Sequence, residues 1–227
     1  MGVSLTKRQS VSLSKASNQL TTINVGLGWD PIKKSKGLLG SLFGGGGSDS
    51  IDLDASCVLI DAQGKVVDTV WFRQLSSHCK SVIHSGDNLT GEGDGDDETI
   101  KVDLTKLPAN VEHLAFTVNS FRGQTFNEVE NAFVRVVDNK KSELAKFNLN
   151  EKGSHTGVLI ASLRRNGGDW TFTARGLACK GRTVSEMHPQ IIQEHNDIVE
   201  SIEKGEKERA TKVTCTHIDN QVQTVSD

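Results

Sequence analysis

The chain has 227 residues, of which 35% are hydrophobic, and it carries a formal net charge of −3 at pH 7. This length allows one sizeable domain with an extension, and a mean hydropathy of −0.36 indicates a soluble protein. No apolar run reaches the length of a membrane span and no clustered basic stripe occurs, so we expect neither an integral membrane protein nor a nucleic-acid partner.

Short alternating or apolar segments separated by turn signals predict a chain made mostly of β-strands. The turn signal Asn166-Gly-Gly-Asp169 predicts a β-hairpin between the strands that flank it. Many short strands at regular spacing are typical of a sandwich, so the fold class is predicted as all-β, a two-sheet β-sandwich. In chain order we expect strands at 11–14, 21–29, 51–61, 66–72, 81–84, 98–103, 112–119, 132–138, 143–148, 157–165 and 170–177, with one helical turn at 126–131.

Residues 33–50 are predicted to form a Gly-rich inserted loop. Residues 44–47 are four consecutive glycines, which cannot hold regular structure. Four apolar residues and three lysines precede these glycines in the loop. Exposed apolar groups near cations suit a partner or an anionic membrane surface, and a plain surface loop is the alternative.

The most acidic stretch of the chain lies between Gly86 and Glu98, with six carboxylates, one amide and no Lys or Arg. Such closely spaced like charges repel one another, and the interleaved glycines allow sharp turns that can aim several oxygens at one cation. Hard oxygen ligands without His or Cys suit Ca²⁺, and a solvated acidic loop is the alternative. The candidate ligands are Asp87, Asn88, Leu89 through its carbonyl, Glu92, Asp94, Asp96, Asp97 and Glu98.

Two earlier segments offer further carboxylates. Asp52 and Asp54 are expected on one side of a strand, where adjacent like charges are costly unless something neutralises them. Asp30 follows another predicted strand and precedes a proline. Three acidic clusters at strand ends favour a shared site. Because the acids exceed what one ion with roughly six to eight oxygen ligands needs, we expect two Ca²⁺ ions. The spacing does not fit an EF-hand.

Residues 182–227 are predicted to form an amphipathic helical extension that ends in a polar tail. Ile191, Ile198 and Ile202 recur at helical spacing on a charged background. Pro189 is tolerated in a first helical turn, which places the expected start of the helix just before it. The polar end of the segment is expected to fray.

Four long motifs follow one another along the chain. They are Val25-Gly-Leu-Gly-Trp-Asp30, Ile51-Asp-Leu-Asp-Ala-Ser56, the acidic stretch Gly86–Glu98, and Phe116-Thr-Val-Asn-Ser-Phe-Arg-Gly-Gln-Thr-Phe126. In this order they resemble the TerD-domain family of tellurium-resistance and stress-response proteins. Val70-Trp-Phe-Arg-Gln-Leu75 and Asn119-Ser-Phe-Arg-Gly-Gln124 look most like its TerZ branch. The resemblance covers residues 1–181 and implies a TerD-like calcium-binding β-sandwich with no established enzyme activity.

We therefore expect a calcium-binding stress-response protein that acts through partner interactions rather than catalysis. The sequence has no phosphate-binding loop, no nucleophile elbow and no clustered His and Cys residues. The alternatives are a metal-assisted hydrolase or phosphoryl-handling enzyme using the same acids, and a purely structural calcium site.

The resemblance also sets expectations for partners and location. The expected partners are other proteins of a tellurite-resistance system, membrane-associated ones included. Because the sequence shows no secretion signal and no Cys-x-x-Cys pairing, we expect the cytoplasm or a peripheral position at the inner face of the membrane. Cys57 lies in an apolar segment, where a buried free thiol is expected.

Overall fold

The computed structural model describes residues 2–16, 20–31, 51–86, 95–150 and 152–223, without the side chains of residues 31 and 206–223. The whole predicted insert at 33–50 and the loop residues 87–94 lie outside the described residues. The described chain divides into two compact units, residues 1–188 and residues 189–227. Each unit is considered by itself.

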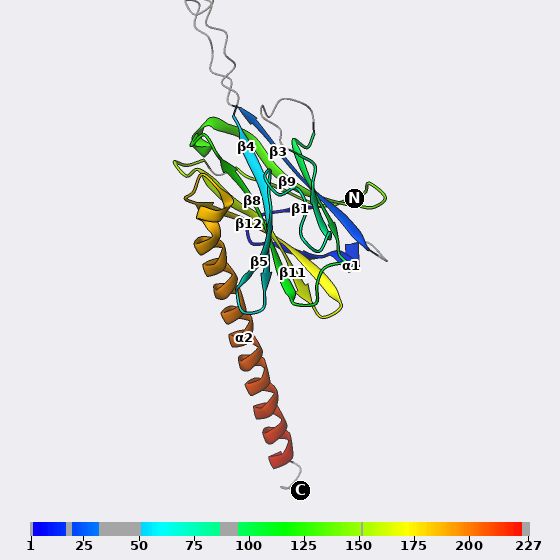
Figure 1. The fold of residues 1–227 in the computed structure, drawn as a ribbon. Helices are drawn as coiled ribbons and strands as arrows, with labels where there is room; N and C mark the ends of the chain where they lie inside the picture. Colours follow the sequence, from blue (N-terminus) through cyan, green and yellow to red (C-terminus); the bar gives the residue numbers. More distant parts are fainter. Residues whose placement is uncertain (1, 17–19, 32–50, 87–94, 151, 224–227) are drawn as a thin grey trace, which may run out of the picture. The chain divides into compact units, whose positions relative to one another are not determined.

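The first unit is a sandwich of two six-stranded sheets (Figure 1), which confirms the predicted fold class. Sheet A has the order β1 (Val3–Leu5), β10 (Glu143–Asn148), β9 (Val129–Asp138), β3 (Thr22–Pro31), β7 (Glu98–Asp103), β6 (Val82–His84). Sheet B has the order β2 (Ser10–Ser12), β12 (Asp169–Cys179), β11 (Gly157–Asn166), β8 (Val111–Ser120), β4 (Leu53–Asp61), β5 (Val66–Val70). Strands β1 and β10 are parallel, and the other described pairs are antiparallel.

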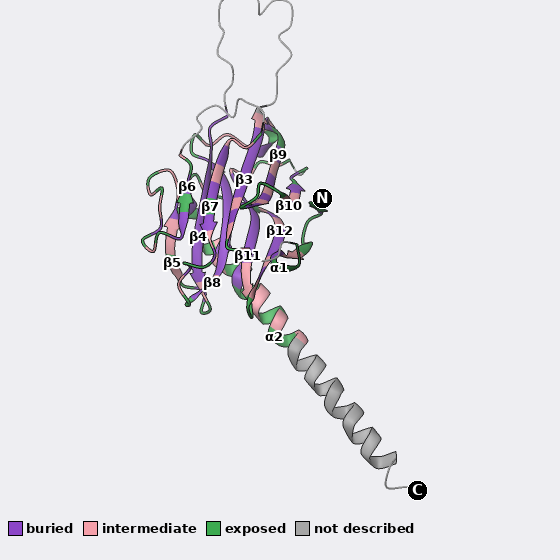
Figure 2. Ribbon diagram, turned by 90° about the vertical axis from the view of Figure 1, so that its right-hand side faces the viewer, coloured by how far each residue is buried: buried purple, intermediate pink, exposed green. Residues whose placement is uncertain are grey.

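The core lies between the two sheets and follows from the alternation of side chains along the strands (Figure 2). In β3, Val25, Leu27 and Trp29 are buried hydrophobic residues. The intervening Gly26 and Gly28 leave room on the outer face, and a Cβ at either would collide with Asp96 or Phe133. The glycines of this motif are therefore explained by side chains that lie across the strand.

Several elements differ from those expected. The strand expected at 11–14 is β2, and it gives way to the short helix α1 (Leu13–Ala16). Strand β1 was not predicted because three residues are too few to show a period. The expected helical turn is the 3₁₀ turn η1 (Phe126–Glu128), after which β9 begins at once. The predicted hairpin is confirmed, since β11 and β12 pair as far as Asn166 and Asp169.

The C-terminal helix α2 (Val184–Gln223) is confirmed and is longer than expected. Its start at Val184 places Pro189 inside the helix, beyond the first turn, where the missing N–H removes one hydrogen bond of the helix ladder. The helix also includes polar residues that we expected to fray, because extending a helix adds one hydrogen bond per residue without requiring burial. No helix in the described part of the chain has the length and apolar character needed to cross a bilayer.

The described cysteines fit the expectation of free thiols. Cys57, Cys79 and Cys179 form no disulfide. Cys57 in β4 is fully buried, and burial raises the pKa of its thiol far above the usual range. This thiol is therefore a small apolar group of the core.

Candidate functional site

The described candidate ligands gather at one end of the sandwich, where β3 ends and β4 and β7 begin. Trp29 near the end of β3 donates its indole N–H to the carbonyl of Ile51 just before β4, at 3.3 Å. Across sheet A, Glu98 at the start of β7 pairs with Leu27 of β3. We call this region the acidic end, and it consists of Asp30, Asp52, Asp54, Asp96, Asp97 and Glu98. The other predicted ligands, Asp87, Asn88, Leu89, Glu92 and Asp94, lie outside the described residues.

Asp97 is held against the end of β3 by its own backbone and side chain. Its backbone N–H donates to the carbonyl of Leu27 at 2.8 Å. Its carboxylate accepts the backbone N–H of Trp29 at 2.8 Å. Burial raises the pKa of Asp97, the Trp29 N–H opposes this effect, and three neighbouring carboxylates raise the pKa further. The three carboxylates are those of Asp30, Glu98 and Asp96. Ionised Asp97 is thus repelled by its neighbours, and a bound cation would relieve that repulsion.

Glu98 links the two sheets through a buried polar cluster. Its Oε2 accepts the backbone N–H of Ala55 in β4 at 2.7 Å and lies 3.2 Å from Nε2 of His84 in β6. The side chains of Glu98 and His84 are both fully buried. Nε2 of His84 also lies 3.1 Å from the carbonyl of Ala55, while Nδ1 accepts the N–H of Gly86 at 3.0 Å. Because Nδ1 is an acceptor, the ring proton belongs on Nε2.

The backbone of β4 explains why this cluster forms. The β4–β5 ladder covers Cys57 to Ile60, so Ala55 lies beyond its end. A buried N–H and C=O without ladder partners would be costly, and Glu98 and His84 of the opposite sheet supply the missing partners. One oxygen of Glu98 is therefore committed to holding the sheets together at the acidic end.

Two other carboxylates are paired with arginines that are distant in sequence. Arg135 donates two hydrogen bonds to the carboxylate of Asp96, from Nε to Oδ1 at 2.8 Å and from Nη2 to Oδ2 at 3.1 Å. The Nε of Arg122 lies 3.0 Å from Oδ2 of Asp52. Sequence reasoning missed both arginines, because proximity along the chain was the only guide to cations. The β3–β9 register would have indicated the Arg135–Asp96 pair, because Arg135 lies opposite Gly26 and Asp96 lies over that glycine.

Asp52 retains one carboxylate oxygen that is available for a ligand. Its side chain is mostly buried, and its Oδ1 accepts no hydrogen bond from any residue that the structure describes. Asp54, also buried, lies opposite Asn119 in the β4–β8 ladder. A buried carboxylate oxygen without a donor is costly unless a cation or a further donor reaches it.

The described acids do not complete a metal site by themselves. Among the described residues, no three His, Cys, Asp or Glu side chains are grouped so that they could hold a metal ion. The repelled carboxylate of Asp97 and the buried Oδ1 of Asp52, which accepts no hydrogen bond from a described residue, suit a hard cation, but they supply only part of a ligand set. A calcium site here would need ligands from residues 87–94 as well.

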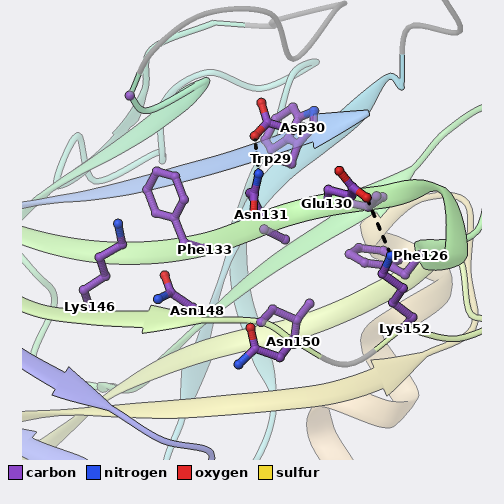
Figure 3. A pocket seen from close by; sticks show the side chains of 14 residues that line it. Trp29, Asp30, Phe126, Glu130, Asn131, Phe133, Lys146, Asn148, Asn150 and Lys152 are labelled. Carbon is purple, nitrogen blue, oxygen red and sulfur yellow. Dashed lines mark hydrogen bonds and ion pairs between the residues drawn. The ribbon is translucent and has the colours of Figure 1, made fainter. Parts of the chain in front are cut away.

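Asp30 belongs to the rim of a separate hollow on sheet A. Its Oδ2 accepts a hydrogen bond from Nδ2 of Asn131 in β9 at 2.8 Å. Beside this pair lies a cavity of about 730 Å³ whose lining includes Asn131, Asn148 and Asn150 (Figure 3). We call it the asparagine-lined cavity. It was not predicted, because its residues come from strands whose pairing the sequence does not reveal.

Comparisons with known proteins agree with the motifs. The model of the TerD domain matches residues 1–188. The tellurium resistance protein TerZ of Serratia marcescens is 67% identical over 190 residues, which cover 84% of this chain and 97% of that protein. The stress response protein SCP2 of Bacillus subtilis (strain 168) is 42% identical over 185 residues, which cover 78% and 92%.

A solved structure supports the fold. The crystal structure of a homologue of telluride resistance protein (TerD) from Streptomyces coelicolor A3(2) has a TM-score of 0.58 and 22% identity to this chain. The match covers 73% of this chain and 94% of that one. At this identity the likeness is evidence for the fold alone.

Proposed function

This chain belongs to the TerD-domain family, and we propose that it is a calcium-binding stress-response protein of the tellurium-resistance type. We propose further that it acts through partner proteins rather than by catalysis. Two relatives, 67% and 42% identical to this chain, are named as a tellurium resistance protein and a stress response protein, which supports the first statement. The observation that carries the calcium proposal is Asp97, a carboxylate whose pKa is raised by burial and by three neighbouring carboxylates.

The proposed calcium ligands come from both the described strands and the loop. Asp97, Asp30, Asp54 and Oδ1 of Asp52 would contribute from the acidic end, and two ions are proposed for the complete set. Asp87, Asn88, Leu89, Glu92 and Asp94 would contribute from the loop. When bound, calcium would neutralise these carboxylates and tie the loop to the strand ends.

Asp96 and Glu98 have an additional role in this proposal. Arg135 holds Asp96, and the backbone of Ala55 holds Glu98. Because the two acids directly follow the loop, their anchors fix its C-terminal end against sheet A and sheet B.

A partly exposed aromatic cluster supports action through a protein partner. Trp71 and Phe72 follow β5, and their ring centroids are 5.0 Å apart. Phe121 follows β8, lies 5.9 Å from Phe72 and is 41% exposed. The guanidinium of Arg73 lies over all three rings. Aromatic and Arg side chains are enriched where proteins bind one another, so we propose this cluster as the contact for another protein of the resistance system.

The proposed setting of this contact is the cytoplasm, including the inner face of the membrane. In a bacterium that lacks its own copy of this gene, the wild-type protein should restore growth on tellurite. Phe121→Ser should restore less growth while keeping calcium affinity, because it removes an exposed ring and no proposed ligand. Full restoration by Phe121→Ser would contradict the proposed contact.

Calorimetric titration with Ca²⁺, with Mg²⁺ as competitor, tests the calcium site. Asp97→Ala and Asp52→Ala should each weaken binding by about tenfold or more, since each removes one charged oxygen ligand. Glu112→Gln is the matched control, because Glu112 lies near the opposite end of β8 from Ser120 and the acidic end. Equal titrations for both Ala variants and the control would show that the acids do not share a calcium site.

A further inference from the structure

The asparagine-lined cavity lies where two strands depart from regular pairing. The β3–β9 register shifts between Gly28 and Asp30, so that Asn131 and Ala132 of β9 lie opposite the single residue Trp29 of β3, and β9 bulges there. In β9, Asn131 has a φ of 51°, in the left-handed region that few non-glycine residues adopt. Bulges and strained residues gather near binding sites, where they redirect side chains. Here Asn131 points toward Asp30 at the edge of the cavity (Figure 3).

The charged residues around the cavity already have partners. Asn131 donates to the carboxylate of Asp30 at 2.8 Å. Nζ of Lys152 lies 4.0 Å from the carboxylate of Glu130, and Nζ of Lys146 lies 4.3 Å from the ring centroid of Phe133. A charged ligand would have to compete with these pairs for its counter-charge. The lining therefore favours a neutral ligand.

Two carboxamides are available on the β10 side. Asn148 and Asn150 are exposed, line the cavity and make no side-chain hydrogen bond with any described residue. Each amide carries two N–H donors and one carbonyl acceptor. A hydroxyl group is both donor and acceptor, so neighbouring hydroxyls match a planar amide. Ala132 and Leu149 form an apolar part of the lining, against which C–H groups can pack.

We propose that the asparagine-lined cavity binds a neutral saccharide. Ring hydroxyls would bond to the amides of Asn148 and Asn150 on one side and to the Asp30–Asn131 pair on the other. The volume of about 730 Å³ lies within the range of small-molecule sites, roughly 300–1,000 Å³, and admits a mono- or disaccharide. The proposal goes beyond calcium binding. The two sites share Asp30, but Asn148 and Asn150 belong to neither the acidic end nor the loop, so their substitution tests the saccharide site separately.

The test uses saturation-transfer NMR and calorimetry on the full-length protein, in calcium and in chelator. The probes are neutral hexoses, pentoses, disaccharides and alditols, compared with a hexose phosphate, a hexuronate and a hexosamine. We expect at least one neutral saccharide to bind. Asn148→Ala and Asn150→Ala should each weaken that binding by about tenfold, as expected for losing a bidentate amide contact.

Asn110→Ala is the matched control, because Asn110 is an exposed asparagine outside the cavity lining. It should leave saccharide affinity unchanged, and all three variants should keep the wild-type melting temperature and calcium affinity. The proposal would be overturned if no neutral probe binds, or if a charged analogue binds more strongly. It would also be overturned if both cavity variants bind the saccharide as well as the wild type. Retained calcium affinity in the same variants separates failure of the saccharide site from failure of the calcium site.

Discussion

The carboxylates at the acidic end differ in which groups compensate their negative charge. Asp52 and Asp96 are each paired with an arginine, and Glu98 accepts a buried backbone N–H. Asp97 accepts the N–H of Trp29, but burial and neighbouring acids raise its pKa. An acid with a raised pKa is less favourable to ionise in the folded chain than in the unfolded one. Asp97 is therefore the residue at which a cation would contribute most.

The first prediction follows from this cost. In chelator at neutral pH, Asp97→Asn should stabilise the protein by about 0.5–1 kcal/mol, a figure kept small because solvent screens a partly exposed group. The amide removes the repulsion and can still accept the Trp29 N–H. Added calcium should then raise the melting temperature less than in the wild type. A variant that is less stable than the wild type in chelator would show that the repulsion is not significant.

At the scale of elements, polar side chains organise the connections between strands. Asp68 lies within β5, and its carboxylate accepts the backbone N–H of His78 at 2.7 Å, the side-chain amide N–H of Gln74 at 2.8 Å and the backbone N–H of Thr69 at 2.9 Å. The imidazole of His78 lies 3.0 Å from the same carboxylate. Burial raises the pKa of Asp68, but these hydrogen bonds outweigh it and hold the pKa below the ordinary value of 3.8.

A prediction for pH dependence follows. Because the folded-state pKa of Asp68 is lowered, its contribution is fully present above the unfolded-state pKa and is lost as the pH falls through the folded-state value. Asp68→Asn should destabilise the protein by about 1 kcal/mol at pH 7, as expected for weakened charge-assisted hydrogen bonds. In acid, urea unfolding should show the two proteins converging. A constant difference from pH 7 to pH 2.5 would contradict this assignment.

Alternation and turn signals in the sequence predicted most strands, because each strand must bury one face. They could not predict β1, which is short, or the bulge of β9 opposite Trp29, which depends on the pairing of β3 with β9. For the site, the sequence predicted that acids would gather at strand ends. It could not assign Arg122 or Arg135 as their partners, since those contacts follow from the register and from the loop after β8.

At the scale of the molecule, the family match and the first compact unit both end at His188. Every proposed calcium ligand lies in this unit. Deleting residues 189–227 should therefore leave calcium affinity and its thermal stabilisation unchanged. Calorimetry and melting curves on full-length and truncated protein provide the comparison. Loss of calcium binding in a truncated protein that remains folded would contradict the separation of metal core and helical extension.

The central claim is that a hard cation binds beside Asp97. Terbium substitutes for calcium in oxygen sites and emits when a nearby tryptophan is excited, and Trp29 is hydrogen-bonded to Asp97. Tryptophan-sensitised terbium emission should appear, should be displaced by Ca²⁺ and should fall in Trp29→Phe, whereas Trp170→Phe should leave it unchanged. The absence of sensitised emission, or emission that Ca²⁺ does not displace, would contradict the claim.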